Sequence, residues 1–198
     1  MMREGARVGV LGGTFDPLHH GHLAGAREVC AALDLDQVLL VPAMHQPFKE
    51  PEDAASPDHR RGMCRAVAAT DPRLEVSTVD IERGGTTFTV DTLRDLSAQL
   101  PGVQLHFIAG ADALTRLSEW KDADDLPGLA QLVGVTRAGH SFPQVDAPYT
   151  LVEVPSLAVS STDIRRRVRT GAPIKYLVPD AVAQYIAQHE LYLGGMDD

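Results

Sequence analysis

The chain has no long apolar stretch, few cysteines and fewer basic than acidic side chains. None of its apolar runs approaches the roughly 20 residues of a membrane-spanning helix. No apolar signal segment separates residues 1–5 from the first predicted strand, so we expect a cytoplasmic protein with no membrane partner. Its two cysteines, Cys30 and Cys64, fall in predicted helices among small apolar residues. That setting indicates buried thiols, not a disulfide framework or a metal site.

The charge balance limits the class of ligand. Against 27 Asp and Glu residues there are only 18 Lys and Arg residues, a formal net charge of −9. A broad nucleic-acid groove needs a basic face, so we expect no nucleic-acid partner. A small anionic ligand needs only a local cluster of donors, and the run Arg165-Arg166-Arg167 supplies one.

The remaining composition is that of an ordinary globular domain, with 44% hydrophobic and 23% charged residues in 198. There is no internal repeat and no low-complexity stretch, which predicts a single domain over residues 1–198. Strands and helices alternate almost throughout, which is typical of an α/β fold, a Rossmann-like doubly wound parallel sheet. The predicted strands are 7–11, 37–42, 74–79, 105–109, 132–136 and 150–154. The predicted helices are 23–33, 57–68 (with Ser56 as N-cap), 90–96, 114–120, 160–171 and 181–189.

Polar or glycine-rich segments follow four of the predicted strands. They are residues 12–22, 43–49, 110–112 and 160–165. In a parallel sheet, ligands bind at the carboxyl ends of the strands, near the point where the strand order reverses. We therefore expect these segments to converge on one site.

The segment after the first strand carries the clearest pattern. Gly12 and Gly13 are followed by Asp16-Pro17, and His19 and His22 then stand three apart at the start of a helix. Free backbone N–H groups, the positive end of the helix dipole and imidazole donors together favour a phosphate group. Solvated histidines are the plainer alternative. A zinc site that also uses His20 is a weaker one, because no cysteine or acidic residue lies at metal-ligand spacing.

A dinucleotide-binding Rossmann module fails both of its sequence requirements. That module needs G-x-G-x-x-G after the first strand and an acidic residue at the end of the second. Here the glycines are Gly9, Gly12 and Gly13, and the second strand ends in Val41-Pro42.

Several other residues each allow a functional and a structural interpretation. Ser160, Ser161 and Thr162 with Arg165 one turn later form a second anion site, or an ordinary N-cap followed by a solvated basic face. Asp112 follows a strand and could bind a ribose hydroxyl or cap a helix. The single tryptophan, Trp120, could stack on a flat ring or pack in the core.

Thr87 and Thr89 follow a pair of glycines in a predicted loop. They could donate to a small carboxylate, or they could be turn and capping residues.

These motifs together resemble those of a known family. The stretch Gly12-Gly13-Thr14-Phe15-Asp16-Pro17-Leu18-His19-His20-Gly21-His22 resembles the His-x-Gly-His signature of the nucleotidyltransferase superfamily. Residues 159–165 look like its second, Ile-Ser-Ser-Thr-x-Ile-Arg-type motif, with Val159 in the first place. Residues 87–93 and 110–120 are similar to those of bacterial nicotinate-nucleotide adenylyltransferases. The motifs occur in family order from Val8 to Leu193.

The resemblance implies a nucleotidyltransferase-type fold and a reaction in NAD biosynthesis. ATP and nicotinate mononucleotide would be the partners, nicotinate adenine dinucleotide and pyrophosphate the products, and Mg²⁺ the cofactor, held mainly by the ATP phosphates. Catalytic roles would fall to His19, His22, Arg165 and Lys49. The implied ATP-binding residues are Gly12, Gly13, Thr14, Phe15, His19, His22, Gly110, Asp112, Ser161, Thr162 and Arg165. The implied nicotinate-nucleotide-binding residues are Thr87, Thr89 and Trp120, and no protein metal ligand is implied.

The loop after the second strand departs from the family pattern. Where the family often has Pro-Pro-His-Lys, this chain reads Gln46-Pro47-Phe48-Lys49. Phe48 replaces the histidine, Lys49 keeps the charge, and His45 is a nearby substitute. A phosphopantetheine or nicotinamide-nucleotide adenylyltransferase is the alternative within the superfamily, and a non-catalytic nucleotide-binding regulator is the alternative outside it. The sequence leaves the oligomeric state open, a homo-oligomer included.

Overall fold

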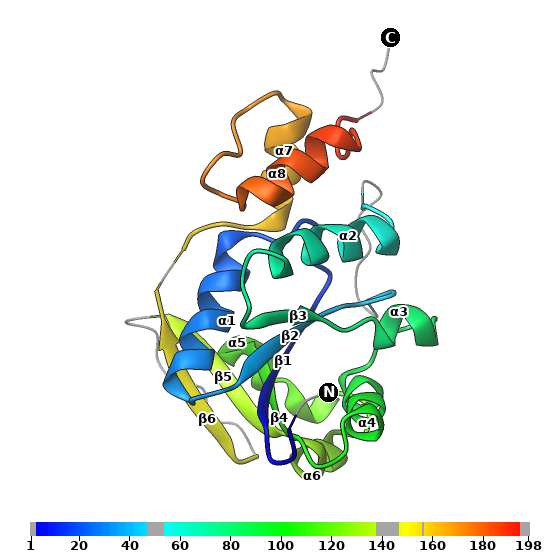
Figure 1. Ribbon diagram of the computed structural model, residues 1–198, viewed down its shortest axis with the longest axis vertical. Helices are drawn as coiled ribbons and strands as arrows, with labels where there is room; N and C mark the ends of the chain where they lie inside the picture. The colour runs from blue at the N-terminus through cyan, green and yellow to red at the C-terminus, as the bar shows by residue number, and fades with distance from the viewer. Residues whose placement is uncertain (1–2, 47–53, 138–146, 156, 195–198) are drawn as a thin grey trace.

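The computed structural model describes residues 3–46, 54–137, 147–155 and 157–194. Its six strands form one sheet in the order β3-β2-β1-β4-β5-β6, and all neighbours pair in parallel (Figure 1). The order reverses between β1 and β4, which makes the carboxyl ends of these strands the expected ligand site. The strands are β1 (Arg7–Gly13), β2 (Gln37–Pro42), β3 (Leu74–Val76), β4 (Gln104–Gly110), β5 (Gln131–Arg137) and β6 (Tyr149–Val154).

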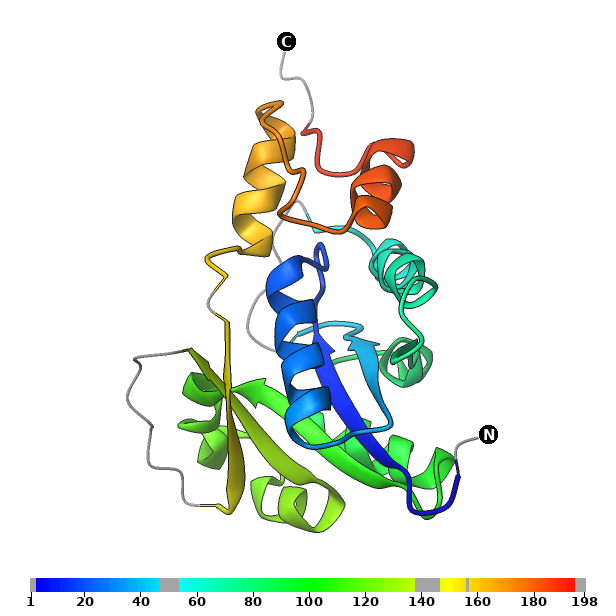
Figure 2. The same ribbon diagram turned by 60° about the vertical axis from the view of Figure 1, so that its left-hand side comes forward.

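Helices cover both faces of the sheet, which confirms the predicted doubly wound α/β architecture. α7 and α8 lie beyond the carboxyl end of the sheet, near the start of α1 (Figure 2). The helices are α1 (His20–Ala32), α2 (Pro57–Ala68), α3 (Val79–Arg83), α4 (Thr89–Gln99), α5 (Ala111–Leu114), α6 (Leu126–Leu129), α7 (Ser161–Arg169) and α8 (Asp180–Gln188), with 3₁₀ turns η1 (Leu117–Glu119) and η2 (Ala123–Asp125).

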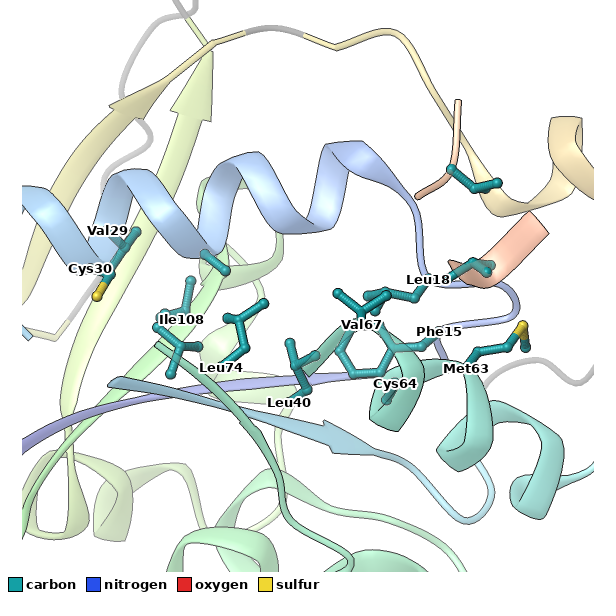
Figure 3. Close-up of a cluster of buried hydrophobic side chains, with 14 of the residues drawn as sticks. Phe15, Leu18, Val29, Cys30, Leu40, Met63, Cys64, Val67, Leu74 and Ile108 are labelled. Carbon is teal, nitrogen blue, oxygen red and sulfur yellow. The ribbon is translucent and has the colours of Figure 1, made fainter. Parts of the chain in front are cut away.

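Alternation along the strands divides the core into two layers. In β2, Val38 and Leu40 pack into the cluster that also contains residues of α1, α2, α7 and α8. Leu39 and Val41 pack into the cluster that contains residues of α4 and α6. This is the period-two pattern of a strand buried on both faces. The first layer also contains Cys30 (Figure 3) and Cys64, both buried as free thiols, as predicted.

Two predicted elements are wrong in their extent. The strand expected over residues 74–79 ends at Val76, and Val79 begins the short helix α3. Buried Asp80 stabilises that helix, because its Oδ1 accepts bonds from the Thr92 hydroxyl at 2.7 Å and from Arg83 Nη2 at 2.6 Å. The bond from Thr92 comes from α4, so the pattern of residues 74–83 does not contain it.

The helix expected over residues 114–120 is also interrupted. α5 ends at Leu114, and η1 covers only Leu117–Glu119. The Thr115 hydroxyl donates to the Asp112 carbonyl at 2.6 Å, which offers the backbone an alternative to continuing the helix.

No helix in the described ranges is long and apolar enough to cross a membrane.

Candidate active site

His19 and His22 form a reciprocal cap at the start of α1. The His22 N–H donates to His19 Nδ1 at 3.4 Å, and the His19 N–H donates to His22 Nδ1 at 3.3 Å. The rings stack with centroids 3.7 Å apart and planes 19° from parallel. Since both Nδ1 atoms accept, this hydrogen-bond pattern assigns the proton of each neutral ring to Nε2. Both imidazoles therefore present an Nε2–H donor.

Gly21, between the two histidines, leaves space for this arrangement. A Cβ at this position would lie 3.0 Å from Cε1 and Nδ1 of His19. Any larger residue would push the His19 ring away from its bond to the His22 backbone. The close approach of the His19 ring thus explains why glycine occupies this position of the His-x-Gly-His pattern.

Burial keeps both imidazoles neutral. Desolvation lowers the pKa of His19 from its ordinary value of 6.5 to about 4. It lowers the pKa of His22 to about 3, and the neighbouring His19 adds to that shift. At pH 7 the pair therefore offers two oriented donors and no charge.

A cavity of about 610 Å³ opens beside these rings at the carboxyl ends of β1, β4, β5 and β6. Its volume is in the range of small-molecule sites. Small residues of α1, Gly21, Gly25 and Ala26, form one wall. The polar side chains that line it are His19, His22, Asp112, Thr115 and Thr136, and the apolar lining includes Leu11, Ile108, Val135, Val154, Leu157 and Val159.

Gly110 and Asp112 both line this cavity. A Cβ at Gly110 would come 2.5 Å from Asp112 Oδ1, so the carboxylate folds back over the glycine backbone. Asp112 is exposed, and α5 has no side-chain N-cap bond. A capping role for Asp112 therefore finds no support.

The residues just after β1 support the histidines from behind and do not line the cavity. Phe15 has a left-handed backbone (φ 52°) and buries its ring in the core between α1 and α2 (Figure 3). Its ring meets the His22 ring edge to face, with centroids 5.2 Å apart. A Cβ at Gly13 would lie 3.0 Å from the Phe15 ring. Gly12 and Gly13 are the last two residues of β1. The Thr14 carbonyl accepts a bond from Arg60 Nη1 at 2.9 Å.

The second predicted anion site joins the first through the backbone. Ser160 caps α7, the Ser161 hydroxyl donates to the Pro17 carbonyl at 2.9 Å, and Thr162 is exposed. Arg165 is buried; its Nη1 donates to the Asp16 carbonyl at 2.8 Å and lies 3.5 Å from Asp16 Oδ2. The N-cap interpretation holds for Ser160. The expectation of a solvated basic face does not hold for Arg165, which is buried.

The residues predicted for the second nucleotide lie outside the cavity. Thr87 Oγ1 accepts the Met44 N–H at 3.0 Å, and the Thr87 N–H donates to the His45 carbonyl at 2.8 Å. Thr89 is the first residue of α4. Trp120 is half-buried and packs edge to face on Phe107, with centroids 6.0 Å apart. Phe48 and Lys49 lie outside the described residues.

Sequence reasoning missed three residues that organise this region: Arg60, Asp16 as a side chain, and Tyr192. Asp16 is buried, and its Oδ1 accepts bonds from the Tyr192 hydroxyl at 2.7 Å and from the Ala55 N–H at 3.0 Å. Arg60 precedes Met63, Cys64 and Val67 at helical spacing, so periodicity could have placed it on the buried face. No local signal connects residue 192 to residue 16.

This chain is similar to proteins of a known family. A family model described as Cytidylyltransferase-like matches residues 10–167. The chain is 52% identical over 184 residues to a "Probable nicotinate-nucleotide adenylyltransferase" of Paenarthrobacter aurescens, covering 92% of this chain and 89% of the relative. It is 50% identical over 188 residues to the protein of the same name from a Nocardioides species, covering 92% of each.

The chain belongs to the cytidylyltransferase-like family. Among solved structures, the nicotinic acid mononucleotide adenylyltransferase of Plasmodium falciparum, complexed with NaAD, has the same fold as this chain. The TM-score is 0.75 at 18% identity over 97% of this chain and 100% of that one. A putative nicotinate-nucleotide adenylyltransferase from Vibrio parahaemolyticus matches with a TM-score of 0.68 at 17% identity, covering 94% of this chain and 95% of that one.

Proposed function

We propose that this protein is a nicotinate-nucleotide adenylyltransferase that transfers AMP from ATP to nicotinate mononucleotide. The observation that carries the proposal is the pair of neutral, oriented imidazoles at the edge of a cavity at the switch point of the sheet. The names of relatives about 50% identical over nearly the whole chain indicate the same reaction. The products are nicotinate adenine dinucleotide and pyrophosphate.

ATP fits the cavity with its phosphates toward α1. The Nε2–H groups of His19 and His22 donate to phosphoryl oxygens, and Asp112 accepts from the ribose hydroxyls. The apolar lining from β5 and β6 takes the base. The family resemblance also assigns residues 12–15 and Ser161, Thr162 and Arg165 to ATP. None of them lines the cavity, so they would act by supporting the loop that carries the two histidines.

The chemical step needs no general base, because the phosphate of the mononucleotide is already an anion at pH 7. One of its oxygens attacks the α-phosphorus of ATP in line. The new P–O bond forms as the bond from the α-phosphorus to the bridging oxygen breaks, and pyrophosphate carries away the electron pair. Donors in fixed positions stabilise the charge that builds up on the transferring group.

Mg²⁺ is the cofactor that the family resemblance implies, and the ATP phosphates would be its main ligands. The described residues contain no cluster of three His, Cys, Asp or Glu side chains that could hold a metal ion. Asp112 is the carboxylate that lines the cavity and is the protein ligand within reach. When bound, the ion neutralises phosphate charge.

The second nucleotide would lie outside the cavity, on the face of the sheet that α4 covers. Thr87 and Thr89 would recognise the nicotinate carboxylate there, Trp120 would stack on the pyridine ring, and Lys49 would pair with phosphate. These roles rest on the family resemblance.

Pyrophosphate release from ATP and nicotinate mononucleotide tests the proposed function, with the dinucleotide product identified by mass. We expect release only when both substrates are present. Equal use of nicotinamide mononucleotide would contradict carboxylate recognition. Binding of ATP with no pyrophosphate release from any mononucleotide would favour a nucleotide-binding regulator.

A further inference from the structure

Arg60 is a buried cation with an unusual set of acceptors. Its side chain comes from α2 and is 3% exposed. Nη1 donates to the carbonyls of Thr14 at 2.9 Å and Ala43 at 2.6 Å, and Nη2 donates to that of Met44 at 2.9 Å. Nε donates to the Ala55 carbonyl at 3.2 Å. The planar guanidinium fork suits this, because one rigid group can reach several carbonyls at once.

These carbonyls belong to separate loops at the carboxyl end of the sheet. Thr14 follows β1, Ala43 and Met44 follow β2, and Ala55 precedes α2. We call residues 43–46 the β2 wall. On its other side the Met44 N–H donates to Thr87 Oγ1, and the Ala43 N–H donates to the Gly13 carbonyl at 2.9 Å. The wall is thus held between Arg60, the end of β1 and the loop before α4.

The β2 wall lies apart from the ATP cavity. None of residues 43–46, Thr14, Ala55 or Thr87 lines that cavity, whose walls come from α1 and from β1, β4, β5 and β6. Thr87, which the wall touches directly, belongs to the predicted site for the second nucleotide. Loss of Arg60 would therefore disturb one substrate more than the other.

We propose that Arg60 is a positioning residue that fixes the β2 wall and thereby sets the affinity for the second nucleotide. It touches neither substrate. It acts by holding the Ala43 and Met44 carbonyls at a fixed distance from the loop after β1. This inference rests on the proposed function for the identity of that nucleotide, but the positioning of the wall can be measured without it.

The test compares Arg60→Lys with Arg61→Lys. Lysine keeps the charge but loses the planar fork. Arg61 is the matched control, since it is the next residue of α2 and its partly exposed side chain pairs with Asp58 at 2.9 Å. We expect Arg60→Lys to raise the KM for nicotinate mononucleotide roughly tenfold or more. The Kd for ATP alone should change less, by about threefold at most, because Arg60 does not line the ATP cavity and bonds to the loop before the histidines through the Thr14 carbonyl.

Amide hydrogen exchange without substrates provides the second readout. Arg60→Lys should speed exchange in a peptide that covers residues 43–46 and leave β4 unchanged, whereas Arg61→Lys should change neither. Two results overturn the inference: kinetics and exchange equal to those of Arg61→Lys, or equal loss of affinity for both substrates. If the wild-type protein forms no dinucleotide, the proposed function fails, and exchange still decides whether Arg60 holds the wall.

Arg60→Gln carries the test if Arg60→Lys unfolds at the assay temperature. It removes the guanidinium fork and leaves no buried charge unpaired. Faster exchange at Met44 together with a raised KM for the mononucleotide supports the inference. Faster exchange with an unchanged KM overturns it.

Discussion

His19 and His22 hold each other through the backbone as well as through their rings. Each Nδ1 accepts the N–H of the other residue, so the donor direction of both Nε2 atoms is set before any ligand arrives. A preorganised donor is worth more than one that must be ordered during the reaction. The pair is therefore a single unit, and changing either member releases the other.

Replacing either histidine tests this unit. We expect His19→Ala and His22→Ala each to lower kcat by roughly 10²–10³, the scale of losing one preorganised donor. The double variant should cost little more than either single one, because the donors are coupled. Steady-state kinetics measure this. The control is His20→Ala, since His20 does not line the cavity. Near-normal turnover in both single variants would contradict the assignment.

The same burial predicts how stability depends on pH. In the unfolded chain these histidines bind protons near pH 6.5, but in the folded protein they bind only near pH 4 and pH 3. Between these values the unfolded state holds more protons, so the free energy of unfolding falls as the pH falls below about 6.5. The combined loss at pH 4 is on the order of a few kcal/mol.

Urea denaturation at several pH values measures this slope. His19→Asn/His22→Asn should flatten it, since asparagine can cap a helix without titrating. An unchanged slope in the double variant would mean that carboxylates alone cause the acid sensitivity.

At the scale of elements, the local sequence pattern predicted most of the strands and helices that position the site. The strand–glycine–helix order from β1 to α1 and the Ser56 cap of α2 were readable, because each follows from neighbouring residues. α3 and the break after α5 were not. α3 depends in part on the bond from the Thr92 hydroxyl of α4 to Asp80, which lies outside its own residues. The buried position of Arg165 was equally hidden, since its partner Asp16 is 149 residues away.

Helix α1 forms a wall of the cavity with residues too small to fill it. Gly25 is buried there, and a Cβ added to it would meet Val135 at an ordinary contact distance of 3.8 Å. We expect Gly25→Ala to bind ATP normally and to stabilise the helix by up to about 1 kcal/mol. Gly25→Leu should fill the cavity and weaken ATP binding by roughly tenfold or more.

Calorimetric titration with ATP compares these two variants, and thermal melting confirms that each is folded. Their substituted residues share one backbone position and differ only in side-chain volume. If Gly25→Leu bound ATP as tightly as Gly25→Ala, the nucleotide would not lie in this cavity.

At the scale of the whole molecule, Asp16 joins segments from both ends of the chain. It receives the Tyr192 hydroxyl, the Ala55 N–H and Arg165, which bring the C-terminal turn, the start of α2 and α7 to the loop after β1. Burial and the Asp16 carboxylate raise the pKa of Tyr192, so the phenol stays a donor. The active-site loop thus depends on parts that are remote in sequence.

Tyr192→Phe isolates the last of these contacts. We expect it to lower the free energy of unfolding by about 1–3 kcal/mol, because Asp16 loses a buried donor. Tyr185→Phe is the control, since its half-buried hydroxyl lies 3.4 Å from His59 Nδ1 and should contribute less than about 1 kcal/mol. Urea denaturation measures both. Equal effects would show that the Asp16 contact contributes no more than an ordinary partly buried one.

The bond between Tyr192 and Asp16 also bears on how the protein is made. The loop that follows β1 leaves the ribosome before the hydroxyl that completes its support, which lies 176 residues further along the chain. A nascent chain can pair β1 with β2 long before it can close this loop. The support of this loop would therefore be completed during translation only once residue 192 has emerged, and a chain that stops before residue 192 would lack this donor to Asp16.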